Sequence, residues 1–253
     1  MQIRRVANRL SRGFLLWGTA GVLTLAAPVE ISGQSNGMSR RSAREIELAV
    51  EVLGLKPGDT IAEIGAGDAR FSLRFAEVVG AGGRAYVNEL GAARVRRIQE
   101  RAERQNLTNV IAVEGAVDDT NLPDNCCDYV VMRHVYHMMT APEPMANSFF
   151  RSLKPGGMLL IMEGDPQPGR SNAKGVPANR AGMGIDPQIV IDELSAAGFV
   201  FDRRVPDWVG SDYALLFRKP ANTGQRDDER GRLRTAPSVL IVQSWSPWPP
   251  WSI

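Results

Sequence analysis

The chain has 253 residues, of which 43% are hydrophobic and 23% charged, a composition ordinary for a globular protein of one large domain or two small ones. Its formal net charge of +2 gives no basic footprint, so no nucleic-acid partner is expected. The two cysteines, Cys126 and Cys127, are adjacent and imply no disulfide framework, because a bridge between neighbours is strained. They are also a poor metal site, and we expect no metal but a small buried pair that leads into a strand.

Residues 1–29 have the pattern of an export signal, with four arginines before a mostly apolar stretch and small residues at Ala26 and Ala27. The apolar stretch of about 15 to 17 residues is short for a spanning helix, which needs roughly 20. We expect a cleaved signal peptide, with an uncleaved membrane anchor as the alternative. The protein would then be exported or membrane-anchored, or its domain would be cytoplasmic if the anchor faces inward.

Residues 30–41, rich in Ser and Gly, predict a linker. Between residues 42 and 219, helices are expected at 42–53, 71–79, 92–105, 142–153 and 187–197. Short apolar strands are expected between them, at 60–64, 85–88, 110–113, 128–132, 158–162, 199–203 and 213–218. This alternation predicts an α/β fold with a doubly wound, mostly parallel seven-stranded sheet, a C-terminal antiparallel strand and helices on both faces. Residues 220–253 predict a disordered tail rich in Trp and Pro.

The first strand runs into the loop Glu63-Ile64-Gly65-Ala66-Gly67-Asp68, and a helix follows. A strand, Gly-x-Gly and a helix in this order place a ligand at the helix N-terminus, where free N–H groups point outward. A dinucleotide site needs a third glycine, and Arg70 stands at that position. A P-loop needs Gly-Lys-Ser/Thr, which is absent.

The loop resembles the first motif of class I S-adenosylmethionine-dependent methyltransferases, which have an acid two residues before Gly-x-Gly. The resemblance implies a Rossmann-like fold over about residues 42–219 and S-adenosylmethionine as cofactor, with Glu63 near its methionine part. Glu89, at the end of the second strand, would accept both ribose hydroxyls, although nicotinamide sites share this position. The cofactor-binding residues implied by the resemblance are Glu63, Gly65, Ala66, Gly67, Asp68, Glu89, Leu90, Val117, Asp118 and Arg133, with Asp118 at the adenine.

Both histidines of the chain follow the fourth strand, in a segment expected to face the methyl group. Methyl transfer needs a base only if the acceptor must lose a proton. His137 is our candidate base and Tyr136 the residue that would orient the acceptor, with His134 as a second candidate base. Packing is the alternative role for all three. The long segment 163–184 carries Arg170, Lys174 and Arg180, which would receive an acidic acceptor unless the segment is a plain solvated loop.

The sequence thus predicts an enzyme of class EC 2.1.1 that methylates a small-molecule acceptor, with possible membrane association through its N-terminus. Two alternatives remain open: a nicotinamide-dependent oxidoreductase, which Arg70 disfavours, and a non-catalytic S-adenosylmethionine-binding protein. The acceptor and its reacting atom are not encoded in any motif of the chain, and neither is the oligomeric state.

Overall fold

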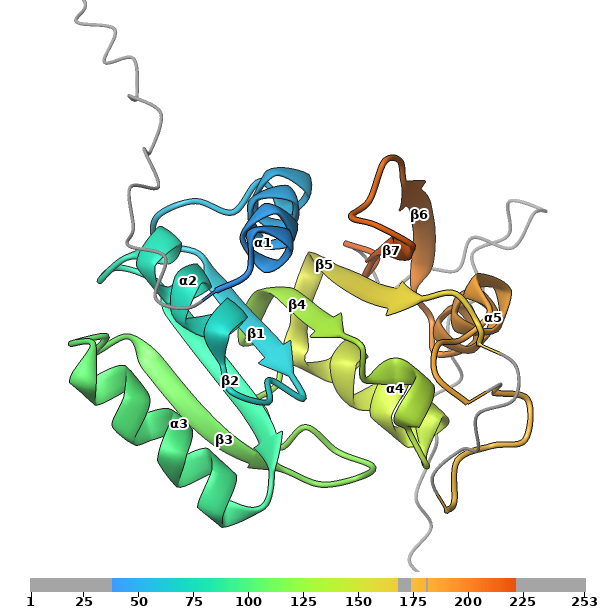
Figure 1. Ribbon diagram of the computed structural model, residues 1–253, viewed down its shortest axis with the longest axis horizontal. Helices are drawn as coiled ribbons and strands as arrows, with labels where there is room; N and C mark the ends of the chain where they lie inside the picture. The colour runs from blue at the N-terminus through green and yellow to red at the C-terminus, as the bar shows by residue number, and fades with distance from the viewer. Residues whose placement is uncertain (1–37, 168–173, 181, 222–253) are drawn as a thin grey trace, which may run out of the picture. The chain divides into compact units, whose positions relative to one another are not determined.

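A computed structural model describes residues 38–167, 174–180 and 182–221 (Figure 1). The predicted signal or anchor at 1–29, residues 30–37 of the predicted linker and residues 222–253 of the predicted tail lie outside the described residues. The last two linker residues, Arg40 and Arg41, belong to the first helix. Among the residues that are described, no helix is long and apolar enough to cross a membrane.

Within the described residues, seven strands form one sheet in the order β3-β2-β1-β4-β5-β7-β6. Neighbouring strands from β3 to β5 pair in parallel, whereas β7 is antiparallel to both β5 and β6. The predicted fold class is therefore confirmed. The strands are β1 (Thr60–Ile64), β2 (Arg84–Leu90), β3 (Val110–Gly115), β4 (Cys127–Arg133), β5 (Leu153–Gly164), β6 (Val200–Val205) and β7 (Asp212–Arg218).

Helices cover both faces of the sheet because successive strand residues point to opposite sides. Ile61, Val131 and Leu160 pack in one core, against α1, α2 and α3. Their strand neighbours Ala62 and Val130 pack in a second core, against α4 and α5. The helices are α1 (Arg40–Leu53), α2 (Arg70–Val79), α3 (Ala92–Arg104), the 3₁₀ turn η1 (Tyr136–Met138), α4 (Pro142–Ser152) and α5 (Pro187–Ala196).

The predicted start of the fifth strand, at residue 158, is wrong. β5 begins at Leu153, which pairs with Cys127, and the register then shifts so that Tyr129 pairs with Met158. The Lys-Pro-Gly-Gly sequence ends α4 as expected, but the chain enters the sheet at once through this irregular stretch instead of through a separate turn. The other predicted boundaries agree with the structure to within about two residues, the usual uncertainty of helix and strand ends.

The two cysteines stand where β4 begins, as expected, and Cys127 is fully buried. The structure also joins Cys126 and Cys127 in a disulfide, which the sequence analysis did not expect. Their Cα atoms are 3.8 Å apart, less than the separation of most bridged pairs. The bridge lies at the amino end of β4, opposite the carboxyl end that carries Arg133.

The strand order predicts a ligand site at the carboxyl ends of β1 and β4. The chain winds from β1 outward to β2 and β3, and then returns to the other side of β1 with β4. In open α/β sheets, ligands bind where the winding reverses, beyond the carboxyl ends of the strands. We therefore expect the loops that follow β1, β2, β4 and β5 to form the ligand site.

The second core depends on Phe217, which is fully buried and meets the rings of Phe199 and Phe201 edge to face. Phe217→Ala is expected to lower the free energy of unfolding by about 3–5 kcal/mol, because it leaves a cavity in that core. The matched control is Val200→Ala, at a largely exposed position on β6, which should cost no more than about 0.5 kcal/mol. Urea unfolding of both variants measures the difference, and equal losses would contradict this account of the core.

Candidate active site

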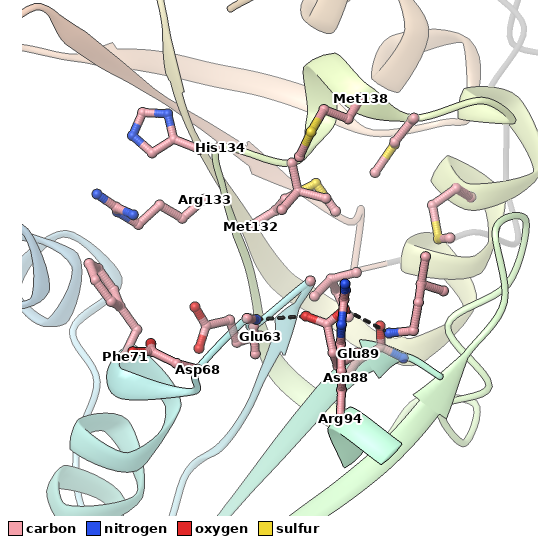
Figure 2. A pocket seen from close by; sticks show the side chains of 18 of the residues that line it. Glu63, Asp68, Phe71, Asn88, Glu89, Arg94, Met132, Arg133, His134 and Met138 are labelled. Atoms are coloured by element: carbon pink, nitrogen blue, oxygen red, sulfur yellow. Dashed lines mark hydrogen bonds and ion pairs between the residues drawn. The ribbon is translucent and has the colours of Figure 1, made fainter. Parts of the chain in front are cut away.

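A cavity of about 710 Å³ opens at the carboxyl ends of β1, β2 and β4. Side chains from three directions meet in it: Glu63 and Phe71 beside the glycine loop, Asn88 and Glu89 at the end of β2, and Arg133 at the end of β4 (Figure 2). Nine of the ten predicted cofactor-binding residues line the cavity: Glu63, Gly65, Ala66, Gly67, Asp68, Glu89, Leu90, Val117 and Arg133. The tenth, Asp118, is exposed and lies outside the lining.

The glycine loop needs its glycines for steric reasons. Gly65 has a φ of 69°, and a Cβ on it would lie 2.7 Å from a methyl carbon of Val135. Gly67 also adopts a left-handed conformation, with a φ of 58°. The loop turns within these residues and delivers the chain into α2. The N-cap of this helix, Ala69, makes no side-chain hydrogen bond. The N–H of Arg70 instead lies 3.4 Å from Oδ1 of Asp68, and the N–H of Ser72 donates to Glu63.

Glu89 ties the end of β2 to the glycine loop. Its Oε2 accepts a hydrogen bond from the backbone N–H of Gly67 at 2.7 Å. Its Oε1 accepts from the N–H of Leu90 and pairs with Arg94 at 3.2 Å, and dashed lines mark such contacts in Figure 2. The carboxylate is thereby fixed at the cavity wall with acceptor capacity left over, since each oxygen has two lone pairs. It is arranged to receive the paired hydroxyls of a ribose.

Glu63 is buried beneath the loop. Its Oε2 accepts hydrogen bonds from the backbone N–H of Ser72, at 2.8 Å, and from the Ser72 hydroxyl. Burial is the largest influence on this carboxyl and raises its pKa to about 7, although the Ser72 hydrogen bonds and the charge of Arg133 oppose the shift. A cationic ligand in the cavity would stabilise the ionised form. The site therefore suits a ligand with positive charge near Glu63 and a ribose near Glu89.

The far side of the cavity is formed by the residues after β4. Arg133 donates from Nε to the buried Glu45 of α1 at 2.8 Å and stacks over the Phe71 ring. His134 follows it and lines the cavity, together with a group of methionines. The methionines that line this side are Met132, Met138, Met139 and Met145.

Comparison with known proteins agrees with this geometry. A family model described as a methyltransferase domain matches residues 62–161. A methyltransferase domain therefore lies within residues 62–161, and its fold and cavity agree with the class I S-adenosylmethionine-dependent type. The glycine loop, Glu63 and Glu89 fit this cofactor, because they offer a glycine cradle, a carboxylate for the cationic methionine part and a carboxylate for the ribose.

Among curated proteins, a ubiquinone/menaquinone biosynthesis C-methyltransferase of Ectopseudomonas mendocina is 28% identical over 51% of this chain and 50% of its own length. The chain thus matches about half the length of this relative. A solved S-adenosylmethionine-dependent methyltransferase from Aquifex aeolicus has a TM-score of 0.58 at 21% identity, over 69% of this chain and 89% of that one. The [4+2]-cyclase SpnF has the same TM-score at 18% identity, over 71% and 82%. At such identities the likeness shows the fold alone.

The predicted catalytic pair does not reach the cavity. Tyr136 is fully buried in η1, where its hydroxyl donates to Glu193 at 3.0 Å and burial raises its pKa far above the ordinary value. His137 is also buried, and its Nδ1 lies 2.9 Å from Glu163. Neither residue belongs to the cavity lining. Their predicted catalytic roles find no support in this geometry, and His134 is the histidine that the methyltransferase domain presents to its cavity.

Sequence reasoning missed Asn88 and the methionines of the cavity wall. Asn88 is buried, lines the cavity and donates from Nδ2 to the carbonyl of Thr120 at 2.7 Å. Its position directly before Glu89, near the carboxyl end of a strand, could have identified it as a residue of the site. No pattern of the sequence brings together methionines from β4, η1 and α4.

Of the predicted basic residues of segment 163–184, neither Lys174 nor Arg180 lines the cavity. Arg180 is buried and pairs with Glu193 of α5 at 2.7 Å, which makes it part of the packing. Lys174 is exposed, and Arg170 lies outside the described residues. The expected reception of an acidic acceptor by these residues stays a prediction.

One group of side chains has the composition of a metal site. A ring nitrogen of His134 and carboxylate oxygens of Glu45 and Asp212 all lie within 4.8 Å of one another. Both carboxylates already have cationic partners, however, since Glu45 pairs with Arg133 and Asp212 with Arg41 at 2.6 Å. These ion pairs give the group another explanation, as a charge network between α1 and the strand ends.

The raised pKa of Glu63 predicts a pH-dependent cost to stability in the absence of ligand. A carboxyl whose pKa rises from 4.5 to about 7 on folding destabilises the protein progressively as pH rises between those values. Glu63→Gln should therefore leave stability unchanged near the lower value and raise it by up to about 3 kcal/mol at pH 8, a limit set by about 1.4 kcal/mol per pKa unit. Glu51→Gln, at an exposed position of α1, is the control.

Urea unfolding without ligand, at about pH 4.5 and pH 8, measures this effect. The same gain at both pH values, or a loss at pH 8, would contradict the assignment of a raised pKa to Glu63.

Proposed function

We propose that the protein transfers the methyl group of S-adenosylmethionine to a small-molecule acceptor bound between the cofactor and the residues after β4. The observation that carries the proposal is the continuity of one cavity from the glycine loop and Glu89 to His134 and the methionines. The cofactor, when bound, supplies a methyl group on a positively charged sulfur. The protein has to hold that group in line with the acceptor and exclude water.

The residues divide this work by position. The glycine loop receives the cofactor, Glu63 balances its positive charge, and Glu89 fixes its ribose. Ile64 and Met132, which pair across β1 and β4, close the cavity floor with apolar side chains. An apolar floor keeps water from the reacting centre and strengthens the electrostatic contacts above it.

The names of the curated relatives supply a narrower candidate, C-methylation in quinone biosynthesis. Because the chain matches only about half of those proteins, the proposal is limited to the donor, the reaction type and a small acceptor. The oxidoreductase alternative finds no support in the comparisons, and Arg70 forms part of an exposed ion pair at the position where a dinucleotide fold needs glycine.

Glu89 provides the sharpest test of cofactor binding. Glu89→Gln should weaken S-adenosylmethionine binding by roughly 10- to 100-fold, because hydrogen bonds to a charged group contribute about 1.5–3 kcal/mol. Glu100→Gln, on the exposed face of α3, should bind like the wild type. Isothermal titration calorimetry of the full-length proteins with S-adenosylmethionine, and separately with NADH, gives both affinities.

Binding of NADH without S-adenosylmethionine would replace the proposal with an oxidoreductase. Tight S-adenosylmethionine binding without transfer of labelled methyl to any member of a broad acceptor screen would leave a non-catalytic binding protein.

We also propose that residues 1–29 direct the protein into or across a membrane, on the strength of their arginine-rich start and apolar stretch. Fractionation of cells that express the full-length chain with a C-terminal tag should recover it in the membrane or outside the cytoplasm. N-terminal sequencing should find either cleavage after the small residues or an intact anchor. Recovery from the cytosol with an intact N-terminus would contradict the proposal.

A further inference from the structure

His134 has a strained position in the cavity wall. It follows the last residue of β4 with a φ of 51°, the left-handed region that a residue with a side chain rarely adopts. Its backbone N–H donates to the carbonyl of Met162 at 2.9 Å, so the neighbouring strand holds this conformation in place. The imidazole is 33% exposed and belongs to the cavity lining, beside Arg133 in Figure 2. Backbone strain of this kind gathers at functional sites, where surrounding contacts maintain it.

Two carboxylates from different strands flank the imidazole of His134. Its Nε2 lies 3.0 Å from Oδ2 of Asp212, the first residue of β7. Its Nδ1 lies 3.9 Å from Oε2 of Glu163 on β5. Glu163 is fully buried and is held by the N–H of His137 and by the Nδ1 of that histidine.

The nearer carboxylate indicates the roles of the two ring nitrogens. With Asp212 beside Nε2, the favoured neutral form carries its proton on Nε2 and leaves the lone pair on Nδ1. Glu163 is too far from Nδ1 for a hydrogen bond but close enough to stabilise a positive charge on the ring. The imidazole is thus prepared to take up one proton through Nδ1.

Charged groups from three elements surround His134. The carboxylates that face it are Asp212, Glu163 and Glu45, one each from β7, β5 and α1. Two guanidinium groups, of Arg41 on Asp212 and Arg133 on Glu45, are paired with them. The third carboxylate, Glu163, is held by the ring of His137.

We propose that His134 is the general base of the methyl transfer, with Asp212 and Glu163 as its positioning residues, and that the acceptor is an aromatic compound with an ionisable hydroxyl group. The inference rests on the proposed function. A base is needed only by an acceptor that loses a proton, which separates a hydroxyl from a thioether or a tertiary amine. The methionines of the same wall favour an aromatic ring, because thioether sulfur adapts to flat apolar groups and contacts ring edges favourably.

The step balances in protons and electrons. The hydroxyl proton passes to Nδ1 of His134, and the oxygen electron pair attacks the methyl carbon of the donor. The bond between that carbon and the sulfonium sulfur breaks, its electrons stay on sulfur, and S-adenosylhomocysteine leaves. The imidazolium then returns its proton to solvent, so no metal, oxidant or reductant takes part.

The variant that tests this inference is His134→Gly. Glycine adopts the left-handed backbone without strain, so the fold is preserved, and the missing imidazole leaves space for free imidazole in solution. The probes are 4-methylphenol and 4-nitrophenol with labelled S-adenosylmethionine, at a pH where only the nitrophenol is ionised. The full-length protein is used throughout, and S-adenosylmethionine affinity is measured in parallel for every variant.

The variant should lower kcat for 4-methylphenol by about a hundredfold or more, the contribution usual for a positioned base. For 4-nitrophenol, which has already lost its proton, the loss should stay below about tenfold, and added imidazole should restore transfer to 4-methylphenol only. Asp212→Asn should show a smaller loss with the same dependence on the acceptor. Asp202→Asn, at an exposed position of β6, is the matched control and should behave like the wild type.

Equal losses for both phenols, without rescue by imidazole, would overturn the assignment of His134 as a base. Methylation of neither phenol by a wild-type protein that binds S-adenosylmethionine would overturn the acceptor class and leave the proposed donor intact. Absence of S-adenosylmethionine binding would instead refute the proposed function itself. Transfer abolished by EDTA and restored by Mn²⁺ would make His134, Glu45 and Asp212 metal ligands and so overturn the inference.

Discussion

At the carboxyl ends of β1, β2 and β5, three buried glutamates accept hydrogen bonds from backbone N–H groups of other segments. Glu63 receives the N–H of Ser72, Glu89 that of Gly67, and Glu163 that of His137. Each bond fixes a loop or a helix start against a strand of the sheet. Because a buried carboxylate without such donors would be strongly unfavourable, these contacts decide where the cavity walls stand.

Two of these carboxylates, Glu63 and Glu89, line the cavity. Near them, the site favours a ligand with a positive sulfur and an ammonium group. In the protein without ligand, burial of the Glu63 carboxylate is unfavourable and raises its pKa to about 7. A bound cation stabilises the ionised carboxylate and offsets part of this unfavourable free energy. The same buried charge therefore binds the donor and destabilises the empty site.

The cofactor half of the site could be predicted from the sequence because it is local. Glu63 and the glycines lie within one loop, and Glu89 ends the next strand, so strand periodicity and turn chemistry place them together. Even here the prediction had limits. Asp118 is near the expected loop but exposed, and the start of β5 was displaced by an irregular pairing with β4 that no propensity encodes.

The acceptor half could not be predicted, because it depends on distant residues and on one unusual backbone conformation. His134 and His137 are three residues apart, and the left-handed φ of His134 sends one side chain to the cavity while the other is buried. The partners of His134 come from β5 and β7, and Glu45 comes from α1. A fold that fixes its donor by a local loop and its acceptor by contacts between separate elements can change the acceptor without losing the donor.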